Sequence, residues 1–348
     1  MLIGLPRCGS TMQEVNIDVN LPPFKLLSEY NLYSGDLKEL IPNTGLLPFD
    51  LITPLFSDYA KKLRFVWMPE GISATYSEKD VFEFPIGAVL IKNFYFPHDF
   101  SDEAKGRRVI ETRLLVNRPS GWDALAYIWN DEQTEAKLEI AGGIKQVKWR
   151  AANGEIVETP YIIPNKNQCK GCHVGDGKFL PIGPKARNLN MDYNYAGEVI
   201  NQLKKWSDIG YLTDMPAGDT IPKIAKWDEE DSGTLEERAM AYLEVNCGTC
   251  HNRKGPAHTT GLYLTVFEKE PTHLGMCKSP VAAGLGSGGR IYDIVPGKPE
   301  ESILTFRMES TNPGIMMPEL GRKLVHKEGV ELIKRWITSI KGTCGEES

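Results

Sequence analysis

Two short strings of one pattern constrain this chain more than any other feature. Residues 169–173 read CKGCH and residues 247–251 read CGTCH, so each string is Cys-x-x-Cys-His. Two cysteines at this spacing can each form a thioether with one vinyl group of a porphyrin, and the adjacent histidine then reaches the iron. The sequence therefore predicts two covalently attached haem c groups, each with an iron. The predicted anchors and axial ligands are Cys169, Cys172 and His173 for the first haem, and Cys247, Cys250 and His251 for the second.

Two other chemistries also use paired cysteines. A structural zinc ion can be held by two Cys-x-x-Cys pairs, but 74 residues lie between Cys172 and Cys247, against roughly 15–20 in compact zinc modules. Zinc bound by four thiolates also leaves His173 and His251 without a role. A thioredoxin-like redox pair explains one of the strings and not two. A zinc-stabilised binding module is therefore the alternative that a haem assay must exclude.

The haem chemistry also predicts a compartment. Haem c is attached to free thiols outside the bacterial cytoplasm, so we expect a periplasmic protein or a surface-exposed lipoprotein. Residues 1–7 are too short for the apolar core of a secretory signal, and the native signal peptide is expected to be absent or truncated. Cys8 would be the lipid anchor of a lipoprotein; the alternative is a free cysteine in a disordered terminus.

The charge balance limits the partners. The chain has 40 basic and 46 acidic residues, a net charge of −6, whereas a nucleic-acid-binding protein shows a basic face. No run of 18 apolar residues occurs, so no transmembrane helix is expected. The expected partner is a redox protein of unknown identity and not a nucleic acid.

The length of 348 residues favours two domains, and the first is expected to be rich in strands. Residues 1 to about 80 show no clear periodicity, and residues 20–23, 41–45 and 47–54 are predicted to be loop-rich packing segments. Apolar alternation predicts strands over 88–96, 109–116 and 122–129, with Ile110, Thr112, Leu114 and Val116 on one face of the second. Asn153-Gly154, within 146–157, is a hairpin signal. We expect an antiparallel β-rich domain over residues 1–225, with the first haem at its C-terminal end.

The rest of the chain is expected to be helical. Residues 196–206 suit a helix, and the acidic stretch 228–234 suits a domain boundary followed by a helix start. A helix is then predicted from residue 234 into the second motif. Residues 327–340 carry an apolar stripe of helical period. The expected fold class is α+β, with an all-α class I cytochrome c-like domain over residues 226–348.

Residue chemistry predicts the distal ligand of the second haem but does not decide that of the first. A methionine thioether is a common second axial ligand, and Met317 directly precedes a proline between the second motif and the last helix. Met316 is the alternative ligand. The remaining alternative is a methionine that only packs in the hydrophobic core. His258 and His273 are expected to be loop residues. For the first haem the sequence leaves an open position or four groups undecided: Met191, Met215, His98 and Lys92.

Several strings support a resemblance to known families. In its order of parts, the stretch 247–340 resembles class I cytochrome c domains. The strings at 53–60, 110–115, 129–133, 181–185 and 317–322 resemble a little-characterised bacterial family of dihaem c-type cytochromes. That resemblance covers nearly the whole chain after about residue 25. It implies electron transfer in the periplasm and supplies no substrate.

A second resemblance concerns the β-rich part. Residues 84–88 (FPIGA), leading to Lys92 and then to strands and Cys-x-x-Cys-His, are similar to lysine-cross-linked hydroxylamine-oxidising monohaem cytochromes. This implies a first haem against a β-sheet with an open or apolar distal side. Lys92 would then match the region of the cross-linking lysine; a surface lysine in a strand is the ordinary alternative.

Two functions follow from these expectations. The first is a dihaem electron-transfer protein in which His251 and Met317 hold the second iron. The second is a haem oxidoreductase whose first haem has an open distal site that binds or oxidises a small molecule such as NO, hydroxylamine or peroxide, while the second haem relays electrons. Whether the chain is an enzyme stays undecided at this point. Cys277 and Cys344 either pair in an oxidising compartment or remain separate thiols.

Overall fold

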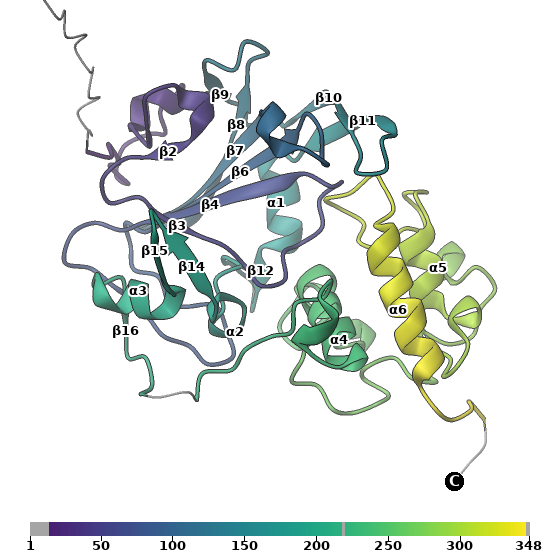
Figure 1. Cartoon of the computed structure of the whole chain (residues 1–348). Coiled ribbons are helices and arrows are strands. Elements are labelled where there is room, and N and C mark those ends of the chain that lie inside the picture. The colour runs from purple at the N-terminus through teal and green to yellow at the C-terminus, as the bar shows by residue number, and fades with distance from the viewer. Residues whose placement is uncertain (1–13, 218–219, 346–348) are drawn as a thin grey trace, which may run out of the picture.

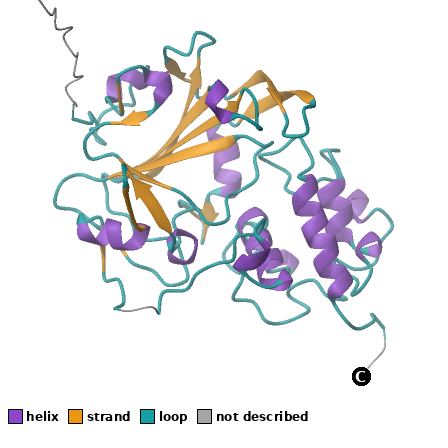
Figure 2. Cartoon of the chain, viewed as in Figure 1, coloured by secondary structure: helices purple, strands orange, loops and turns teal. Residues whose placement is uncertain are grey.

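A six-stranded antiparallel sheet forms the centre of the N-terminal part of the chain (Figures 1 and 2). The structure is a computed structural model, which describes residues 14–217 and 220–345. The strand order is β3-β4-β6-β7-β8-β9. The bounds are β3 (Leu47–Phe49), β4 (Lys61–Trp67), β6 (Val89–Pro97), β7 (Arg107–Arg118), β8 (Gly121–Trp129) and β9 (Ala136–Leu138). The three strands predicted over 88–96, 109–116 and 122–129 are therefore confirmed.

The two faces of this sheet have different roles. Leu114, Tyr127 and Trp129 belong to an apolar core on one face. The predicted alternation in β7 holds for Thr112, which is buried, and for Leu114, but fails at Ile110. The register between β6 and β7 shifts at this point, which inserts an extra residue into β7. Ile110 consequently packs with Phe94 in the cluster on the opposite face.

A β-hairpin covers part of that opposite face. β10 (Gly143–Arg150) and β11 (Ile156–Ile163) pair in antiparallel register, and Gly154 at the turn has φ +85°. Asn153-Gly154 therefore lies in the connection between the paired strands, as predicted. Trp149 of β10 stacks on Phe96 of β6 with ring centroids 4.7 Å apart. The hairpin thus covers part of this face of the sheet, and the chain continues from β11 into the first motif.

Two expectations about local structure are wrong. The segments 41–45 and 47–54, predicted to be loop-rich, contain the short strands β2 (Ile41–Pro42) and β3, and the sequence did not predict β4. Within 196–206, residues Glu198–Asn201 form β15, which pairs with β14 (Asp192–Tyr195). The helix α3 (Gln202–Asp208) begins only after Asn201, whose side chain accepts from the backbone N–H groups of Leu203 and Lys204. That side-chain cap fixes the helix start six residues later than expected.

The remaining elements before the second motif are short. The helices are α1 (Lys166–Cys172) and α2 (Ala186–Leu189). The strands are β1 (Tyr33–Ser34), β2 (Ile41–Pro42), β5 (Ala74–Thr75), β12 (Val174–Gly175), β13 (Lys178–Phe179) and β16 (Leu212–Thr213). β16 pairs in parallel with β5 and returns the chain to the N-terminal part.

Three helices dominate the C-terminal part: α4 (Leu235–Asn246), α5 (Ile303–Glu309) and α6 (Lys327–Ser339). Thr234 and Glu237 form a capping box at the start of α4. Ile333 and Ile337 of α6 are fully buried in one cluster with residues of α4. The two predicted helices, from residue 234 and over 327–340, are therefore confirmed.

A glycine sets the distance between α4 and α6. An added Cβ at Gly329 of α6 would overlap the ring of Tyr242 in α4. Only glycine therefore allows the two helices to approach this closely.

Cys277 and Cys344 form a disulfide with Cα atoms 5.2 Å apart. The structure thus settles the pairing that the sequence left open.

The overall class is α+β, as expected. In the described ranges, no helix is long and apolar enough to cross a membrane. The domain boundary at residues 225 and 226, and the class I cytochrome c character of the helical part, stay predictions.

Candidate functional site

The first motif lies at the end of α1. Asn165 and Gln168 form a capping box at the start of this helix, and His173 follows its last residue. His173 Nδ1 lies 2.9 Å from the carbonyl oxygen of Leu180. Because a carbonyl only accepts, Nδ1 must donate, and this leaves the lone pair on Nε2.

The surroundings of His173 keep it neutral and oriented. Burial, opposed by the hydrogen bond to Leu180 and aided by the charges of Lys92 and Arg113, lowers its pKa to about 4. The β12–β13 hairpin returns Phe179 against the imidazole, with ring centroids 5.3 Å apart and the planes 16° from parallel. A neutral imidazole with a fixed tautomer and a free Nε2 is the form that binds a metal.

The second motif begins where α4 ends. Cys247 is the C-cap of the helix, and an added Cβ at Gly248 would overlap the Leu264 carbonyl oxygen. Burial lowers the pKa of His251 to about 4, while a hydrogen bond to the backbone of Leu262 opposes this shift. His251 is therefore also neutral at ordinary pH.

The two motifs open onto one cavity of about 660 Å³. This volume lies within the range of roughly 300–1,000 Å³ that is typical of pockets for small molecules and cofactors. The motif residues that line it are Cys169, Cys172, His173, Cys247, Thr249 and Cys250. His251 is not among the lining residues. The sequence assigned one motif to each domain and did not predict that they share a cavity.

The motifs also lie close together. The interaction of the Cys172 and Cys250 side chains lowers the pKa of Cys172 to about 7 and raises the pKa of Cys250. Cys172 is the last residue of α1 and Cys250 follows the end of α4, so the two come from different parts of the fold. The attachment points of the two predicted haems are thus neighbours.

Both candidate methionines line the same cavity. Met316 is only 4% exposed, whereas Met317 is partly exposed. The backbone carbonyl of Met317 accepts from Arg322 Nη2 at 2.8 Å and from Nε at 3.2 Å. Asp58 accepts from the N–H groups of Lys323 and Leu324 at 2.7–2.9 Å. A carboxylate of the N-terminal part therefore holds the segment that follows Met317.

Of the four candidates for the distal ligand of the first haem, one lines the cavity and three do not. Lys92, in β6, lines the cavity. His98 is exposed, Met191 packs against a small cluster around Ile52, and Met215 packs against a separate core. These last three do not line the cavity. His258 and His273 do not line it either. His273 lies in a turn, as expected, whereas His258 begins a short 3-10 helix, His258–Thr260.

Sequence reasoning missed two residues that matter here. His326 lines the cavity, stacks on Phe56 at 4.2 Å between ring centroids and bonds to the hydroxyl of Tyr242 through Nδ1. Arg64, also in the lining, is an arginine at a buried position of β4. Only the second left a sequence signal, because Arg64 lies between the apolar residue Leu63 and the apolar run FVW at 65–67.

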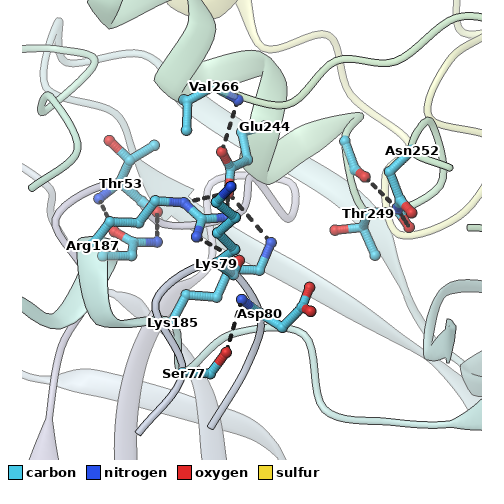
Figure 3. Close-up of polar contacts among 12 residues, drawn as sticks. Thr53, Ser77, Lys79, Asp80, Lys185, Arg187, Glu244, Thr249, Asn252 and Val266 are labelled. Carbon is cyan, nitrogen blue, oxygen red and sulfur yellow. Dashed lines mark hydrogen bonds and ion pairs between the residues drawn. The ribbon is translucent and has the colours of Figure 1, made fainter. Parts of the chain in front are cut away.

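A buried ion-pair network joins the second motif to the β-rich part (Figure 3). Glu244 of α4, three residues before Cys247, is 3% exposed and accepts from Arg187 Nε at 2.8 Å and from the Val266 N–H at 3.0 Å. Lys185 Nζ lies 3.3 Å from the same carboxylate. Arg187 also donates to the carbonyl of Lys79 at 2.7 Å. This network fixes α4, and therefore Cys247, relative to the rest of the cavity.

The donor geometry bears on the zinc alternative. Among residues 14–217 and 220–345, no three His, Cys, Asp or Glu side chains converge closely enough to hold a metal ion. The thiols of the two motifs meet in one pair, and this does not form the four-ligand arrangement of structural zinc. Cys8, the candidate lipid anchor, lies outside the described residues.

Comparison with models of protein families, with curated proteins and with solved structures finds no match for this chain. The resemblances based on short strings therefore stay predictions.

Proposed function

We propose that this chain is a periplasmic dihaem c-type cytochrome that transfers electrons through two covalently attached haem c groups. Cys169 and Cys172 would anchor the first and Cys247 and Cys250 the second, with His173 and His251 as proximal ligands. The observation that carries the proposal is the shared cavity onto which both Cys-x-x-Cys motifs open, lined also by the neutral His173. The redox partner is a protein of unknown identity.

The residues present fit the proposed groups. The cysteines of both motifs line the cavity, both histidines are held neutral by burial, and Met316 and Met317 line the same cavity. A haem, when bound, supplies one-electron redox chemistry at its iron. The chain's own contribution is to anchor, to orient and to exclude water. Met317 or Met316 is the proposed distal ligand of the second haem, and Met317 is preferred.

Two further contacts support the proposal. The Cys172–Cys250 contact makes the attachment points neighbours, which suits transfer between two redox groups inside one protein. The Cys277–Cys344 disulfide suits an oxidising compartment, because disulfides are rare in cytosolic proteins.

The test is haem content combined with mass spectrometry. The protein expressed with a haem c attachment system should give a pyridine haemochrome equivalent to two haems per chain. The Cys169→Ala/Cys172→Ala and Cys247→Ala/Cys250→Ala variants should each retain one. The Cys277→Ser/Cys344→Ser variant is the control and should retain both. A protein without haemochrome, or one that binds zinc stoichiometrically, would overturn the proposal.

A second candidate is the haem oxidoreductase, and one observation favours it. Of the four distal groups considered for the first haem, only Lys92 lines the cavity. If no side chain of the cavity binds the first iron, that position would be open to a small molecule such as NO, hydroxylamine or peroxide. Adding CO or NO to the ferrous protein distinguishes the two candidates. A shift of the Soret band for one of two haems supports the oxidoreductase, and an unchanged band supports electron transfer alone.

A further inference from the structure

Three basic side chains form a row across the centre of the sheet. Arg64 of β4 pairs directly with Lys92 of β6, and Lys92 pairs directly with Arg113 of β7. Directly paired residues of neighbouring strands point to the same face. All three line the cavity. At about 4.8 Å between strands, the row spans roughly 10 Å from Arg64 to Arg113.

Such a row is unfavourable for folding by itself. Like charges directly opposite one another in a sheet are destabilising, and here two such pairs are adjacent. Burial lowers the pKa of Lys92 well below its usual range, and the charges of Arg64 and Arg113 lower it further. A sequence that keeps this arrangement violates a local rule, which is typical of functional sites.

The carboxylates nearby neutralise only part of the row. Arg113 makes two hydrogen bonds to Glu111, at 2.6 and 2.8 Å. Asp50 pairs with Arg64 through Nη1. Lys92 Nζ lies 4.8 Å from the centroid of the Phe94 ring and has no carboxylate within 4.0 Å among the described residues.

One guanidinium nitrogen of the row lacks any partner. The Arg64 side chain is 5% exposed, and its Nη2 is buried with no hydrogen-bond partner in the part of the chain that is described. A buried donor without a partner costs about 1–3 kcal/mol. Arg64 is among the residues that line the cavity, although Nη2 itself is covered. An acceptor in the cavity would satisfy Nη2 once the guanidinium group turns toward it.

Basic residues also outnumber acidic residues in the lining of the cavity as a whole. Seven Lys or Arg residues and five Asp or Glu residues line it, although the chain as a whole has a net charge of −6. The positive surplus is therefore local to the cavity.

We propose that Arg64, Lys92 and Arg113 form a binding site for a carboxylate or a small oxyanion on the sheet side of the cavity. The guanidinium groups offer planar forked donors and Lys92 offers a point charge, a combination that suits these anions. The anion has two conceivable sources: the propionate groups of a haem attached at the first motif, or a free anion that enters the cavity. The first source rests on the proposed function and the second does not.

The first test measures binding of free anions to the full-length protein as isolated. Formate and nitrite are titrated by calorimetry at constant ionic strength, with chloride as the balancing anion. Lys92→Gln is compared with Lys137→Gln, which removes an exposed lysine in β9 of the same sheet. If the site takes a free anion, the wild type and Lys137→Gln bind it, and Lys92→Gln binds at least tenfold more weakly.

The second test applies if neither anion binds. The midpoint potential of each haem and the propionate vibrations in resonance Raman spectra are then measured for the same variants. If propionate occupies the site, Lys92→Gln lowers the potential of one haem and alters its propionate bands, because a cation near the group favours the reduced state. Lys137→Gln changes neither. Equal behaviour of the two variants in both tests overturns the proposed anion site.

Two controls keep the outcome interpretable. Lys92→Gln removes repulsion within the row, so it should fold, and circular dichroism checks this. Arg64→Lys keeps the charge but removes the unpartnered Nη2, and should weaken the same signal. The pyridine haemochrome assay separates the two proposals: a protein without haem contradicts the dihaem function, while the anion titration still tests the row.

Discussion

Cys172 and Cys250 interact in the wall of one cavity, where the pKa of Cys172 falls to about 7 and the pKa of Cys250 rises. These residues come from two motifs that lie in different parts of the fold, one at the end of a helix beside the central sheet and one after α4. The two motifs therefore border the same cavity. The proposed function would use that relationship, because two redox groups attached at neighbouring sites would exchange electrons within the chain.

The distal ligand can be identified by redox titration. Met317→Ala should lower the midpoint potential of one haem, because a thioether favours Fe(II). The expected shift is about a tenth or more of the roughly 0.8 V range that axial ligands cover. Met316→Ala is the matched control and should leave the potential nearly unchanged. The reverse result would assign Met316 as the ligand.

The buried carboxylate of Glu244 should control how α4 docks. Glu244→Gln leaves Arg187 and Lys185 without their charge partner, which should lower the free energy of unfolding by about 3 kcal/mol. Urea denaturation of the holoprotein measures this. Lys204→Gln, which breaks the exposed pair of Lys204 with Asp208 at 2.7 Å, should change it by less than about 0.5 kcal/mol. Equal effects of the two substitutions would argue against a role for the network.

Glu244 should also make the free energy of unfolding depend on pH. Burial alone would raise the pKa of Glu244, but the charges of Lys185 and Arg187 outweigh it and hold the pKa below its ordinary value of 4.5. The folded state then binds this proton less tightly than the unfolded chain. Its contribution to stability is present above the unfolded pKa and is lost as the pH falls through the folded pKa. The stability difference between wild type and Glu244→Gln should therefore shrink as the pH is lowered below about 4.5; a constant difference would contradict this.

Gly329 should tolerate no side chain. Gly329→Ala places a Cβ on the ring of Tyr242, and overpacking of this kind typically costs about 1–3 kcal/mol. Thermal denaturation should show a lower Tm. Gly314→Ala, where the nearest atom to the new Cβ is an exposed side-chain oxygen 3.5 Å away, is the control and should change little.

The disulfide should stabilise the C-terminal part without affecting haem attachment. Cys277 and Cys344 are 67 residues apart in sequence, so their link restricts the unfolded chain. Cys277→Ser/Cys344→Ser should lose about 2–4 kcal/mol of unfolding free energy. Haem content should stay at the wild-type value. A loss of haem in this variant would mean that the disulfide is needed to form the site.

The sequence by itself determined the features that depend on neighbours in the chain. The Asn153-Gly154 connection, the helix that starts at Thr234 and the apolar stripe of α6 each follow from residues within one or two turns of one another. The two Cys-x-x-Cys-His strings are of the same kind, because three residues fix the spacing of thiols and imidazole. The helix expected over 196–206 failed for a local reason too: β15 takes its first half, and the cap at Asn201 delays the helix start.

Only the tertiary structure decided how these parts meet. β4 was missed although Leu63 and Phe65 alternate with Lys62 and Arg64, because this pattern is short and the apolar Val66 interrupts it. Arg64 faces the cavity and not a packed core. The contact of Cys172 with Cys250, and the exclusion of His98 and Met191 from the cavity, depend on packing between segments far apart in the chain. No short-range pattern encodes such contacts, since they arise when α4 and the sheet bury separate apolar faces and bring distant segments together.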